Sequence, residues 1–525
     1  MELRLSEHAR WFGGRRELVL FHQRNGAVIP VREPVRQALL PLVPALAGWP
    51  RARGPADPQA VARARERLLR WRLLVPPDCD EERELAGWYP LRSPWSVFYV
   101  EADGSVLRAR WDRTQQRPVL ERLAGLPARL WQICDGTHPL AEILADAGQH
   151  ARALRELLGR WTGIEQQLLK WLPAPANTFT EGPPPEVLSH TKHLRCFGPA
   201  PPARPPAEDE PELTRYHRER IRTAEEQFEL RESTLSHLYR EPHPALGGRS
   251  YGARLAEVLR ERGLLGPHTR RIVEVGGGTG AMAEAFLEAL PAPAPVRHYT
   301  IVELAPALLA AQRRRLSGSP GALPAAVHWV QGHAEALPLR SGCTDLLLCN
   351  EVIADLRVAP DPARPGRLLN AGALVLLQEI ARVLAPGGGA FVSEYGELEG
   401  EVRPAEGLDH AEHTIRFGEL VARAHALGLQ AALEPLDALF GFAADTPVLF
   451  ADAIHLAELD AIARHFGGEL PALAYTPAML QQRLGGVLEL DRLFHLHFSP
   501  LGRGLPTAGL APAVFKALLL RKPRA

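Results

Sequence analysis

The sequence predicts an α/β fold for residues 213–525, preceded by two small α+β modules. Three observations support this prediction. An apolar strand that begins at Arg271 runs directly into a glycine-rich turn and then a helix. Further strands and helices alternate up to about residue 395, which is typical of a largely parallel sheet with helices on its faces. The stretch from Pro173 to Pro211 holds 11 of the 48 prolines and separates the two parts.

The composition limits the classes of protein to which this chain belongs. Its 525 residues suffice for two to four domains of roughly 100–200 residues each. The 61 basic side chains balance 61 acidic ones, which argues against a nucleic-acid binder because such proteins rely on a cationic surface. The N-terminus has no apolar signal core, and no apolar run approaches the ~20 residues of a membrane span. We therefore expect a cytoplasmic protein with neither a nucleic-acid nor a membrane partner.

The first N-terminal module, residues 1–88, begins with a predicted β-hairpin. Two apolar runs flank Asn25-Gly26, a dipeptide that supplies the positive φ angles of a tight turn. Helical patterns follow at Pro34–Leu46 and Asp57–Arg72, and Leu73–Pro76 has the pattern of a returning strand. A hairpin followed by short helices predicts a winged-helix-like module.

The second module, residues 89–172, repeats this plan in degenerate form. Its hairpin turns at Asp103-Gly104, and helical patterns follow over Leu126–Leu144 and Ile164–Trp171. The proline-rich segment that follows, residues 173–212, is predicted to be a semi-rigid extended spacer without regular helix or sheet.

Two segments of the second module, Ala128–Thr137 and Leu140–Leu144, resemble PqqD-like modules. In that family an apolar pair, an acidic-Gly turn and a helix start follow one another in this order. The resemblance implies that the module binds the leader of a ribosomally made precursor peptide, which docks by adding a strand to the wing. A winged helix used only for packing or dimerisation remains an alternative. DNA binding is less favoured, because the Asp135-Gly136 turn and its helix lack a basic face.

The glycine turn after the first C-terminal strand is the most informative motif. Glycine is required where the backbone adopts positive φ and lies against a ligand. The pattern Glu274-x-Gly276-x-Gly278-x-Gly280 differs from the dinucleotide fingerprint GxGxxG, which makes an NAD-type Rossmann domain the weaker alternative. It is similar to motif I of class I S-adenosylmethionine (SAM) methyltransferases. The resemblance implies a Rossmann-like, seven-stranded methyltransferase domain with SAM as its cofactor.

The strands that follow agree with this resemblance. His298–Glu303 ends in a carboxylate about two dozen residues beyond the glycines, where it suits hydrogen bonding to a cofactor ribose. The fifth βα unit is completed by a helix over Leu374–Leu384, a turn at Pro386–Gly389 and a strand over Ala390–Tyr395. The third strand and its loop span Val327–Pro338. After this strand the family usually has Asp, which is replaced here by His333. The resemblance implies cofactor contacts from Glu274, Gly276, Gly278, Gly280, Glu303, His333, Ala334 and Asn350.

Four further segments resemble the MidA-like family, which includes protein-arginine methyltransferases of complex I assembly. They are Asn350–Val358, Ser393–Gly396, His413–Leu420 and Ala513–Leu520. The departures from the family pattern, such as Glu394 in place of Asp, favour a divergent relative with a different substrate. The marker of adenine or amide methylation, Asn/Asp-Pro-Pro-Tyr after the fourth strand, is absent from the sequence.

Carboxylates at the ends of the fourth and fifth strands are the candidate catalytic groups. A guanidine or amine acceptor needs carboxylates to hold its cation and to accept a proton. We therefore predict catalytic roles for Glu351, Asp355 and Glu394, with Tyr395 lining the acceptor slot. Solvated loop carboxylates and a buried tyrosine are the alternatives.

Two histidine groups and the cysteines have weaker interpretations. Asp409–His413 is interpreted as an ordinary loop, with a loop that faces the substrate as an alternative and metal ligation as a less favoured one. The His495-Leu-His497 group is predicted to be structural, and a helical insertion is expected at about residues 450–490. The five cysteines form no CxxC pair, so neither a disulfide framework nor a metal site is predicted.

The preferred hypothesis is a SAM-dependent methyltransferase that N-methylates a side chain of a precursor peptide captured by the N-terminal modules. Tethering the leader would raise the concentration of the core peptide at the active site. A small-molecule methyltransferase with a dimerising N-terminal region is the second hypothesis. A non-catalytic assembly factor that binds SAM is the third.

Overall fold

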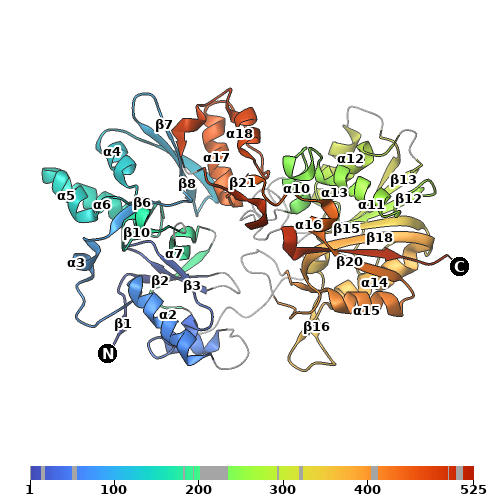
Figure 1. The fold of residues 1–525 in the computed structure, drawn as a ribbon, viewed down its shortest axis with the longest axis horizontal. Coiled ribbons are helices and arrows are strands. Elements are labelled where there is room, and N and C mark those ends of the chain that lie inside the picture. The colour runs from blue at the N-terminus through green and yellow to red at the C-terminus, as the bar shows by residue number, and fades with distance from the viewer. Residues whose placement is uncertain are drawn as a thin grey trace. The chain divides into compact units, whose positions relative to one another are not determined.

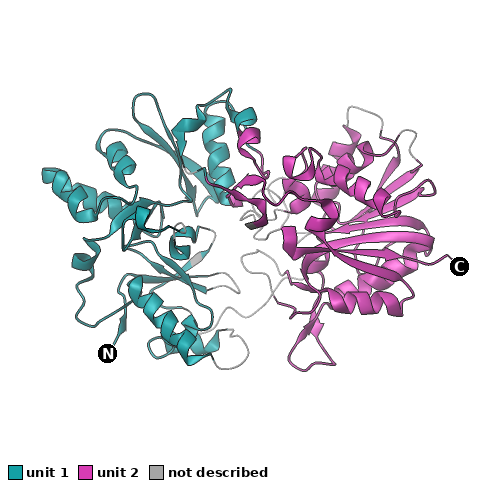
Figure 2. Ribbon diagram, in the orientation of Figure 1, with its two compact units in different colours: residues 1–209, 454–470, 481–496 teal, residues 210–453, 471–480, 497–525 magenta. Residues whose placement is uncertain are grey.

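The structure is a computed structural model that describes residues 2–13, 18–49, 56–180, 184–192, 194–201, 234–291, 295–318, 323–403, 412–494, 496–503 and 512–524. The chain divides into two compact units (Figure 2). Unit 1 comprises residues 1–209, 454–470 and 481–496, and unit 2 comprises residues 210–453, 471–480 and 497–525. Over these described ranges, no helix has the length and apolarity that a membrane crossing requires.

Unit 2 contains a sheet with the strand order β14-β13-β12-β15-β18-β24-β20. Figure 1 labels β12, β13, β15, β18 and β20 of this sheet. The first five strands of this order run parallel, and β24 lies antiparallel between β18 and β20. The strands span Arg271–Val275 (β12), His298–Glu303 (β13), Ala326–Gln331 (β14), Thr344–Asn350 (β15), Leu384–Glu397 (β18), Gln430–Pro435 (β20) and Phe515–Arg521 (β24). A short strand, β19 (Ile415–Arg416), pairs with the end of β18.

Both faces of this sheet are buried beneath helices. Side chains of α11 and α12 share one hydrophobic core with Ile272 and Leu346, and those of α14 and α15 share another with Val273 and Leu347. Successive residues of a strand point to opposite faces, so an apolar run is buried on both sides. The helices span Tyr251–Glu261 (α11), Ala281–Glu288 (α12), Pro306–Ser317 (α13), Ala371–Val383 (α14), Phe417–Ala426 (α15) and Leu436–Phe440 (α16).

The sequence-based prediction of an α/β fold with a seven-stranded path is confirmed in unit 2. The predicted bounds of β13 match those observed, and α14 begins three residues earlier than predicted. One local difference is at Pro386–Gly389, where a turn is predicted but β18 runs through the segment with Gly387 at a φ of +81°.

Unit 1 contains two four-stranded antiparallel sheets and several short helices. The strand orders are β11-β2-β3-β4 and β22-β7-β8-β9. Figure 1 labels β2 and β3 of the first sheet and β7 and β8 of the second. The predicted hairpin turns are confirmed, with Gly26 at a φ of +72° between β3 and β4 and Gly104 at +81° between β7 and β8. The strands span Arg4–Leu5 (β1), Ala9–Gly13 (β2), Leu18–His22 (β3), Val28–Pro30 (β4), Leu74–Val75 (β5), Tyr89–Arg92 (β6), Val97–Val100 (β7), Val106–Asp112 (β8) and Arg117–Leu123 (β9).

The helices of unit 1 follow the predicted hairpins. They span Val35–Leu39 (α1), Pro58–Arg70 (α2), Glu81–Leu85 (α3), Leu126–Ile133 (α4), Leu140–Asp146 (α5) and Ala151–Thr162 (α6). The predicted helix at Ile164–Trp171 is wrong, because Leu169–Leu172 forms a strand, β10, that pairs with β6. The predicted relation of these elements to winged-helix modules stays a prediction.

One continuous hydrophobic core runs through both predicted N-terminal modules. It contains Trp11 and Leu68 from residues 1–88 together with Trp131 and Trp161 from residues 89–172. Because the two segments bury their apolar side chains against each other, they fold as parts of one unit.

The expectation of an extended spacer is wrong for its described part. Pro185–Leu188 forms a helical turn, α7, and Arg195–Gly198 forms a strand, β11, that pairs with the edge of β2. Proline is tolerated at the first position of a helix, where its missing N–H is not needed. Val187 and Leu194 are buried between the prolines, and this burial orders the segment. Residues 202–212 lie outside the described residues.

The predicted helical insertion is present, but much of it belongs to unit 1. Its first helix is α17 (Ala453–His465), and its short strand β22 (Leu493–Phe494) pairs with β7. The ring of Phe494 stacks on Phe98 with centroids 4.8 Å apart. The Glu458 carboxylate accepts hydrogen bonds from Lys192 Nζ at 2.7 and 2.8 Å. The N-terminal unit therefore includes a segment from the C-terminal half of the chain.

Candidate functional site

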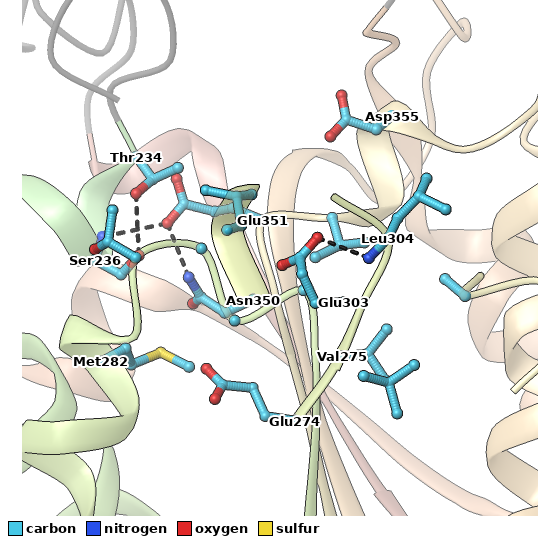
Figure 3. A pocket seen from close by; sticks show the side chains of 18 of the residues that line it. Thr234, Ser236, Glu274, Val275, Met282, Glu303, Leu304, Asn350, Glu351 and Asp355 are labelled. Atoms are coloured by element: carbon cyan, nitrogen blue, oxygen red, sulfur yellow. Dashed lines mark hydrogen bonds between the residues drawn. The ribbon is translucent and has the colours of Figure 1, made fainter. Parts of the chain in front are cut away.

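A pocket lies in unit 2 at the carboxyl ends of β12, β13 and β15 (Figure 3). Ligands of α/β sheets bind at this edge, because the loops that follow neighbouring strands converge there. Its polar and glycine lining residues are Thr234, Ser236, His237, Glu274, Gly276, Gly277, Gly278, Thr279, Glu303, Gly332, His333, Asn350, Glu351 and Asp355.

The glycine loop forms one wall of this pocket with its backbone. Gly276 has a φ of +74°, and a Cβ at this position would collide with the side chain of Val352. Gly278 also has positive φ, at +51°. Gly280 is the residue before the first turn of α12, with a φ of +83°, and is the one predicted cofactor residue that does not line the pocket. The loop therefore needs glycine for its conformation and for close approach of a ligand.

Glu274 lies at the base of the pocket, on β12. Its side chain is buried, and its Oε2 accepts a hydrogen bond of 3.0 Å from the Tyr299 hydroxyl. Its Oε1 is buried and has no hydrogen-bond partner among the described residues. Burial raises the pKa of Glu274 to about 8, against the effect of the hydrogen bond from Tyr299. A buried carboxylate with an unused acceptor atom is suited to a cationic or hydrogen-donating ligand.

Glu303 ends β13, as the sequence predicts. Its Oε1 accepts hydrogen bonds from the backbone amides of Leu304 and Ala305, at 2.8 and 3.0 Å. Its Oε2 accepts a longer hydrogen bond, 3.3 Å, from Gln312. Burial raises its pKa to about 7 in spite of these donors. The amides fix the orientation of the carboxylate at the pocket wall (Figure 3).

Asn350 and Glu351 are tied to each other and to the protein. Asn350 Oδ1 accepts hydrogen bonds from the Tyr251 and Ser393 hydroxyls, at 2.6 and 2.7 Å. Its Nδ2 donates to Glu351 Oε1 at 3.0 Å. The predicted cofactor residue Asn350 lines the pocket, yet its amide groups serve mainly to hold this edge of the sheet together.

Glu351 lines the pocket with both carboxylate oxygens already in use. Oε2 accepts from the backbone amide of Leu235 at 2.9 Å, and Oε1 accepts from that of Ser236 at 3.3 Å (Figure 3). These are the first amides of α10 (Leu235–Leu238), so Glu351 fixes this helix at the pocket. Its φ of +54° is unusual for a residue with a side chain, and such strain concentrates at functional sites. Burial raises its pKa to about 7, and the charge of Glu412 adds to the rise.

The other three predicted catalytic residues differ in position. Asp355 lines the pocket and is half-buried. Glu394 and Tyr395 are buried on β18 and are not among the residues that line the pocket. Glu394 accepts from the backbone amides of Ala354 and Tyr395, and burial raises its pKa well above the ordinary value. The structure thus places Asp355 and Glu351 at the pocket, whereas Glu394 and Tyr395 do not line it.

Thr234, Ser236 and His237 line the pocket and are absent from the sequence-based prediction. They belong to or directly precede α10, in a segment to which the sequence-based prediction assigns no site residue. Burial, followed by the charges of Arg240 and Arg315, lowers the pKa of His237 to about 3, so its ring is neutral at pH 7. No local motif marks these residues, because only the folded chain brings them to the glycine loop.

The segment after the third strand lies at the pocket as predicted. His333 and Ala334 are both lining residues. The His333 ring is held by its own loop, since its Nδ1 accepts a 3.1 Å hydrogen bond from the backbone amide of Glu335. Both residues remain predictions for contact with adenine.

The two predicted histidine groups are described only in part, because Asp409, His410 and His495 lie outside the described residues. Glu412 Oε2 accepts a 3.3 Å hydrogen bond from the Tyr395 hydroxyl, and the amide of His413 donates to Ala354. His497 packs against the ring of Phe450, which agrees with a structural role.

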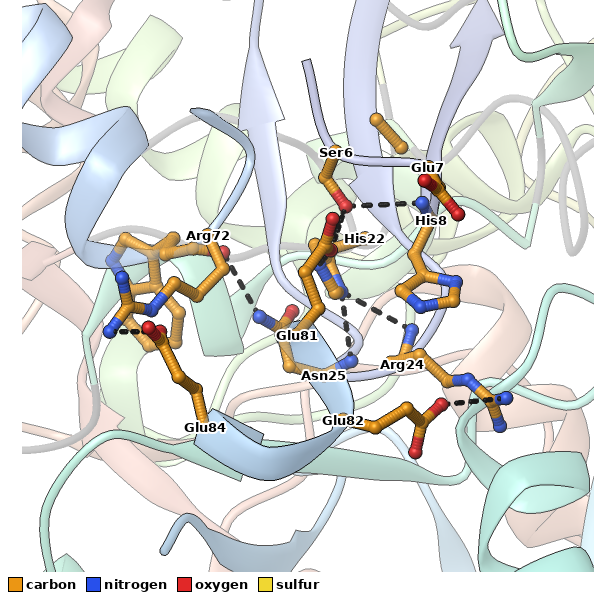
Figure 4. A network of polar contacts seen from close by, with 12 residues as sticks. Ser6, Glu7, His8, His22, Arg24, Asn25, Arg72, Glu81, Glu82 and Glu84 are labelled. Carbon is orange, nitrogen blue, oxygen red and sulfur yellow. Dashed lines mark hydrogen bonds and ion pairs between the residues drawn. The ribbon is translucent and has the colours of Figure 1, made fainter. Parts of the chain in front are cut away.

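A serine, a histidine and a glutamate also meet in unit 1, where they form a buried cluster of Ser6, His22 and Glu81 (Figure 4). His22 Nδ1 accepts hydrogen bonds from the backbone amides of Arg24 and Asn25, so Nε2 must carry the proton. A ring in this state cannot take a proton from Ser6. Burial favours the neutral Glu81, but hydrogen bonds from His22 and Ser6 outweigh it and lower the pKa to about 2. The cluster therefore joins β3 to α3 and is not a nucleophilic site.

The residues around the pocket fit SAM. A fixed carboxylate ends β13, where ribose hydroxyls are bound in folds of this type. The glycine loop allows close approach of a ligand, and Glu274 Oε1 is a buried acceptor without a donor. These three features together supply hydrogen-bond acceptors for hydroxyls and a partner for a cation.

Comparisons with known proteins agree with this site. Residues 273–392 match the family described as a methyltransferase domain. The ubiquinone/menaquinone biosynthesis C-methyltransferase UbiE of Dinoroseobacter shibae is 31% identical over 148 residues, which are 28% of this chain and 49% of that protein. The protein of the same name from Methylobacterium nodulans is 33% identical over 118 residues, 22% of this chain and 44% of its own. The chain spans about half the length of the curated relatives it matches.

Solved structures share a lower level of similarity. The cyclase SpnF has 19% sequence identity and a TM-score of 0.29, over 52% of this chain and 81% of that one. A SAM-dependent methyltransferase from Aquifex aeolicus has 15% identity and a TM-score of 0.25, over 37% of this chain and 90% of that one. The C-terminal region contains a class I SAM-dependent methyltransferase domain.

Proposed function

We propose that this protein uses SAM to methylate a side-chain nitrogen of a ribosomally made precursor peptide, and that its N-terminal modules bind the leader of that peptide. The methyl-transfer part is carried by one observation. The fixed carboxylate of Glu303 and the glycine loop border a single pocket within the residues that match the methyltransferase family. The peptide part rests on the resemblance of residues 89–172 to PqqD-like modules and of unit 2 to the MidA-like family.

The chain's residues have distinct roles toward the cofactor. Glu303 would accept hydrogen bonds from the ribose hydroxyls, and the glycine loop would lie against the cofactor. Glu274 would supply negative charge at the base of the pocket. Glu351 would keep α10 at the pocket, which shields the site from water.

SAM supplies a methyl group that is bound to a positively charged sulfur. Transfer breaks this S–C bond, whose electron pair stays on sulfur, and forms a bond from carbon to the acceptor atom. A nitrogen acceptor must lose a proton to present its lone pair, so a base is needed beside it. Asp355 is our candidate, because it is one of the predicted catalytic carboxylates that line the pocket.

A small-molecule acceptor is the second candidate function. It is favoured by the relatives named as ubiquinone/menaquinone biosynthesis C-methyltransferases. In this case the N-terminal unit would support dimerisation instead of peptide capture. A non-catalytic SAM-binding assembly factor is the third.

The test uses the full chain with SAM, candidate precursor peptides from the gene neighbourhood and a panel of phenols and quinols. Intact-mass analysis would show the gain of one methyl group on the true acceptor. We expect methylation of a peptide, slower reaction when the leader is removed, and inhibition by the free leader. An unchanged rate without the leader would refute leader binding, and methylation of a phenol or quinol alone would favour the second candidate. Glu303→Gln serves as the control variant with impaired cofactor binding.

A further inference from the structure

Glu274 differs from Glu303 and Glu351, two other carboxylates that line the pocket. Both oxygens of Glu303 and of Glu351 accept hydrogen bonds from amide groups. Glu274 Oε1 has no donor among the described residues, although the side chain is 1% exposed and lines the pocket (Figure 3). Nothing in the described part of the protein offsets a negative charge on this oxygen by a hydrogen bond.

The groups that face Glu274 carry no positive charge. Tyr299 and Glu303 face it from β13, and Cys349 faces it from β15. The Tyr299 hydroxyl is itself held protonated by burial, which raises its pKa well above the ordinary value. From α12 the apolar side chain of Met282 lines the same pocket. Burial therefore holds a proton on Glu274 with a pKa of about 8 until a cation enters the pocket.

The substrate and product forms of the cofactor differ by one charge. Both carry an ammonium and a carboxylate group, and only the methyl donor carries a sulfonium. A charged carboxylate that is buried from solvent attracts the more cationic ligand more strongly, whereas a protonated one distinguishes them little. We propose that Glu274 selects SAM over its demethylated product, S-adenosylhomocysteine, and that this selection strengthens as pH rises. This inference rests on the proposed function of the pocket.

The direction of the pH effect follows from proton linkage. SAM binds best to the deprotonated Glu274, so its binding releases a proton at pH values below about 8. Binding of the product releases fewer protons from the protein, because the product lacks the sulfonium. The ratio of the two dissociation constants, product over SAM, should rise roughly tenfold between pH 6 and pH 8. Glu303 and Glu351 also titrate in this range, each with a pKa of about 7. Glu303 would face hydroxyls that both ligands share, and the carboxylate of Glu351 accepts hydrogen bonds from the amides of α10 with either ligand bound. Their effects therefore cancel in the ratio.

Isothermal titration calorimetry tests the inference without turnover. SAM and S-adenosylhomocysteine are titrated into the full chain at pH 6, 7 and 8, each in two buffers of different ionisation enthalpy, which yields the dissociation constants and the protons released. We expect the ratio to rise with pH, and SAM to release more protons than the product. Glu274→Gln should flatten the ratio and remove the difference in protons. Glu303→Gln should weaken both ligands alike and keep the slope of the ratio.

The outcomes separate this inference from the proposed function. Tight binding of SAM with a ratio that does not change with pH in the wild-type protein would overturn the role of Glu274 and leave the methyltransferase proposal standing. Equal weakening of both ligands by Glu274→Gln, with the pH slope kept, would also overturn it. No binding of either ligand would overturn the proposed function and this inference together. The wild-type titrations do not depend on whether the Glu274→Gln protein folds.

Discussion

A buried ion pair should govern the stability of unit 1. Lys192 and Glu458 are 4% and 0% exposed in their side chains, and Lys192 Nζ also donates to the carbonyl oxygen of Trp95 at 2.9 Å. Glu458→Gln removes the negative charge but keeps the size of the side chain. The buried ammonium then loses its counter-charge, which costs about 3–5 kcal/mol when one partner of a buried pair is removed. At ~2–4 °C per kcal/mol for a unit of this size, the melting temperature should fall by roughly 6–20 °C.

Tryptophan fluorescence can measure this change selectively. Nine of the ten tryptophans lie within residues 1–209 of unit 1, and Trp329 of unit 2 is the tenth. Thermal or urea unfolding followed by fluorescence therefore reports unit 1. Circular dichroism of the same samples follows both units.

Two control variants define the outcome that contradicts this reasoning. Glu156→Gln makes the same chemical change in an exposed ion pair, in which the side chain of Glu156 is 67% exposed and that of Arg152 is 93% exposed. This change should lower the free energy of unfolding by at most about 1 kcal/mol. Replacing both charges, Lys192→Met with Glu458→Gln, should recover most of the lost stability, because no unpaired charge remains. If Glu458→Gln costs no more than Glu156→Gln, or if the double variant shows the sum of two large losses, the pair does not stabilise unit 1 as argued.

Three further predictions concern unit 2. Gly276→Ala should weaken SAM binding at least tenfold, as measured by calorimetry, with little change in the circular dichroism spectrum. The reason is that a Cβ at this positive φ collides with Val352 and changes the loop. Unchanged affinity would contradict this prediction. Glu351→Gln should lower the free energy of unfolding by about 1–3 kcal/mol through weaker bonds to the α10 amides, and SAM affinity should fall as well. A variant that only shifts the pH–rate profile would instead indicate a catalytic base. Finally, Glu274, Glu303 and Glu351 have pKa values raised to about 8, 7 and 7, so the native state binds protons more tightly than the unfolded state. Their contribution to stability is full below about pH 4.5 and is lost as pH rises to about 8. The melting temperature of unit 2, measured by circular dichroism, should therefore fall over this range, and it should fall less in Glu274→Gln. A melting temperature that rises with pH would contradict this prediction.

Much of the cofactor site follows from local sequence. The glycine loop depends on conformations that only glycine adopts easily, and Glu303 ends a strand whose apolar run is visible in the sequence. Residues at the ends of adjacent parallel strands converge whatever the rest of the chain does. For this reason seven of the eight predicted cofactor residues line the pocket.

The catalytic prediction was less complete, because carboxylates at strand ends look alike in a sequence. Their hydrogen bonds differ in the fold. Glu351 lines the pocket and accepts from the amides of α10, Asp355 lines the pocket as well, and Glu394 is buried and is not among the lining residues. Partners from distant segments assign these roles, and no spacing rule encodes them.

The sequence by itself determined the α/β architecture, the place of the cofactor loop and the absence of an overall charge, since these depend on local periodicity, glycine positions and composition. Only the tertiary structure decided the limits of the units. It placed residues 454–470 in the N-terminal unit and incorporated part of the proline-rich segment as β11. The physical reason is burial. Apolar side chains and the Lys192–Glu458 pair become buried where complementary surfaces pack together. The sequence pattern alone does not show which surfaces meet.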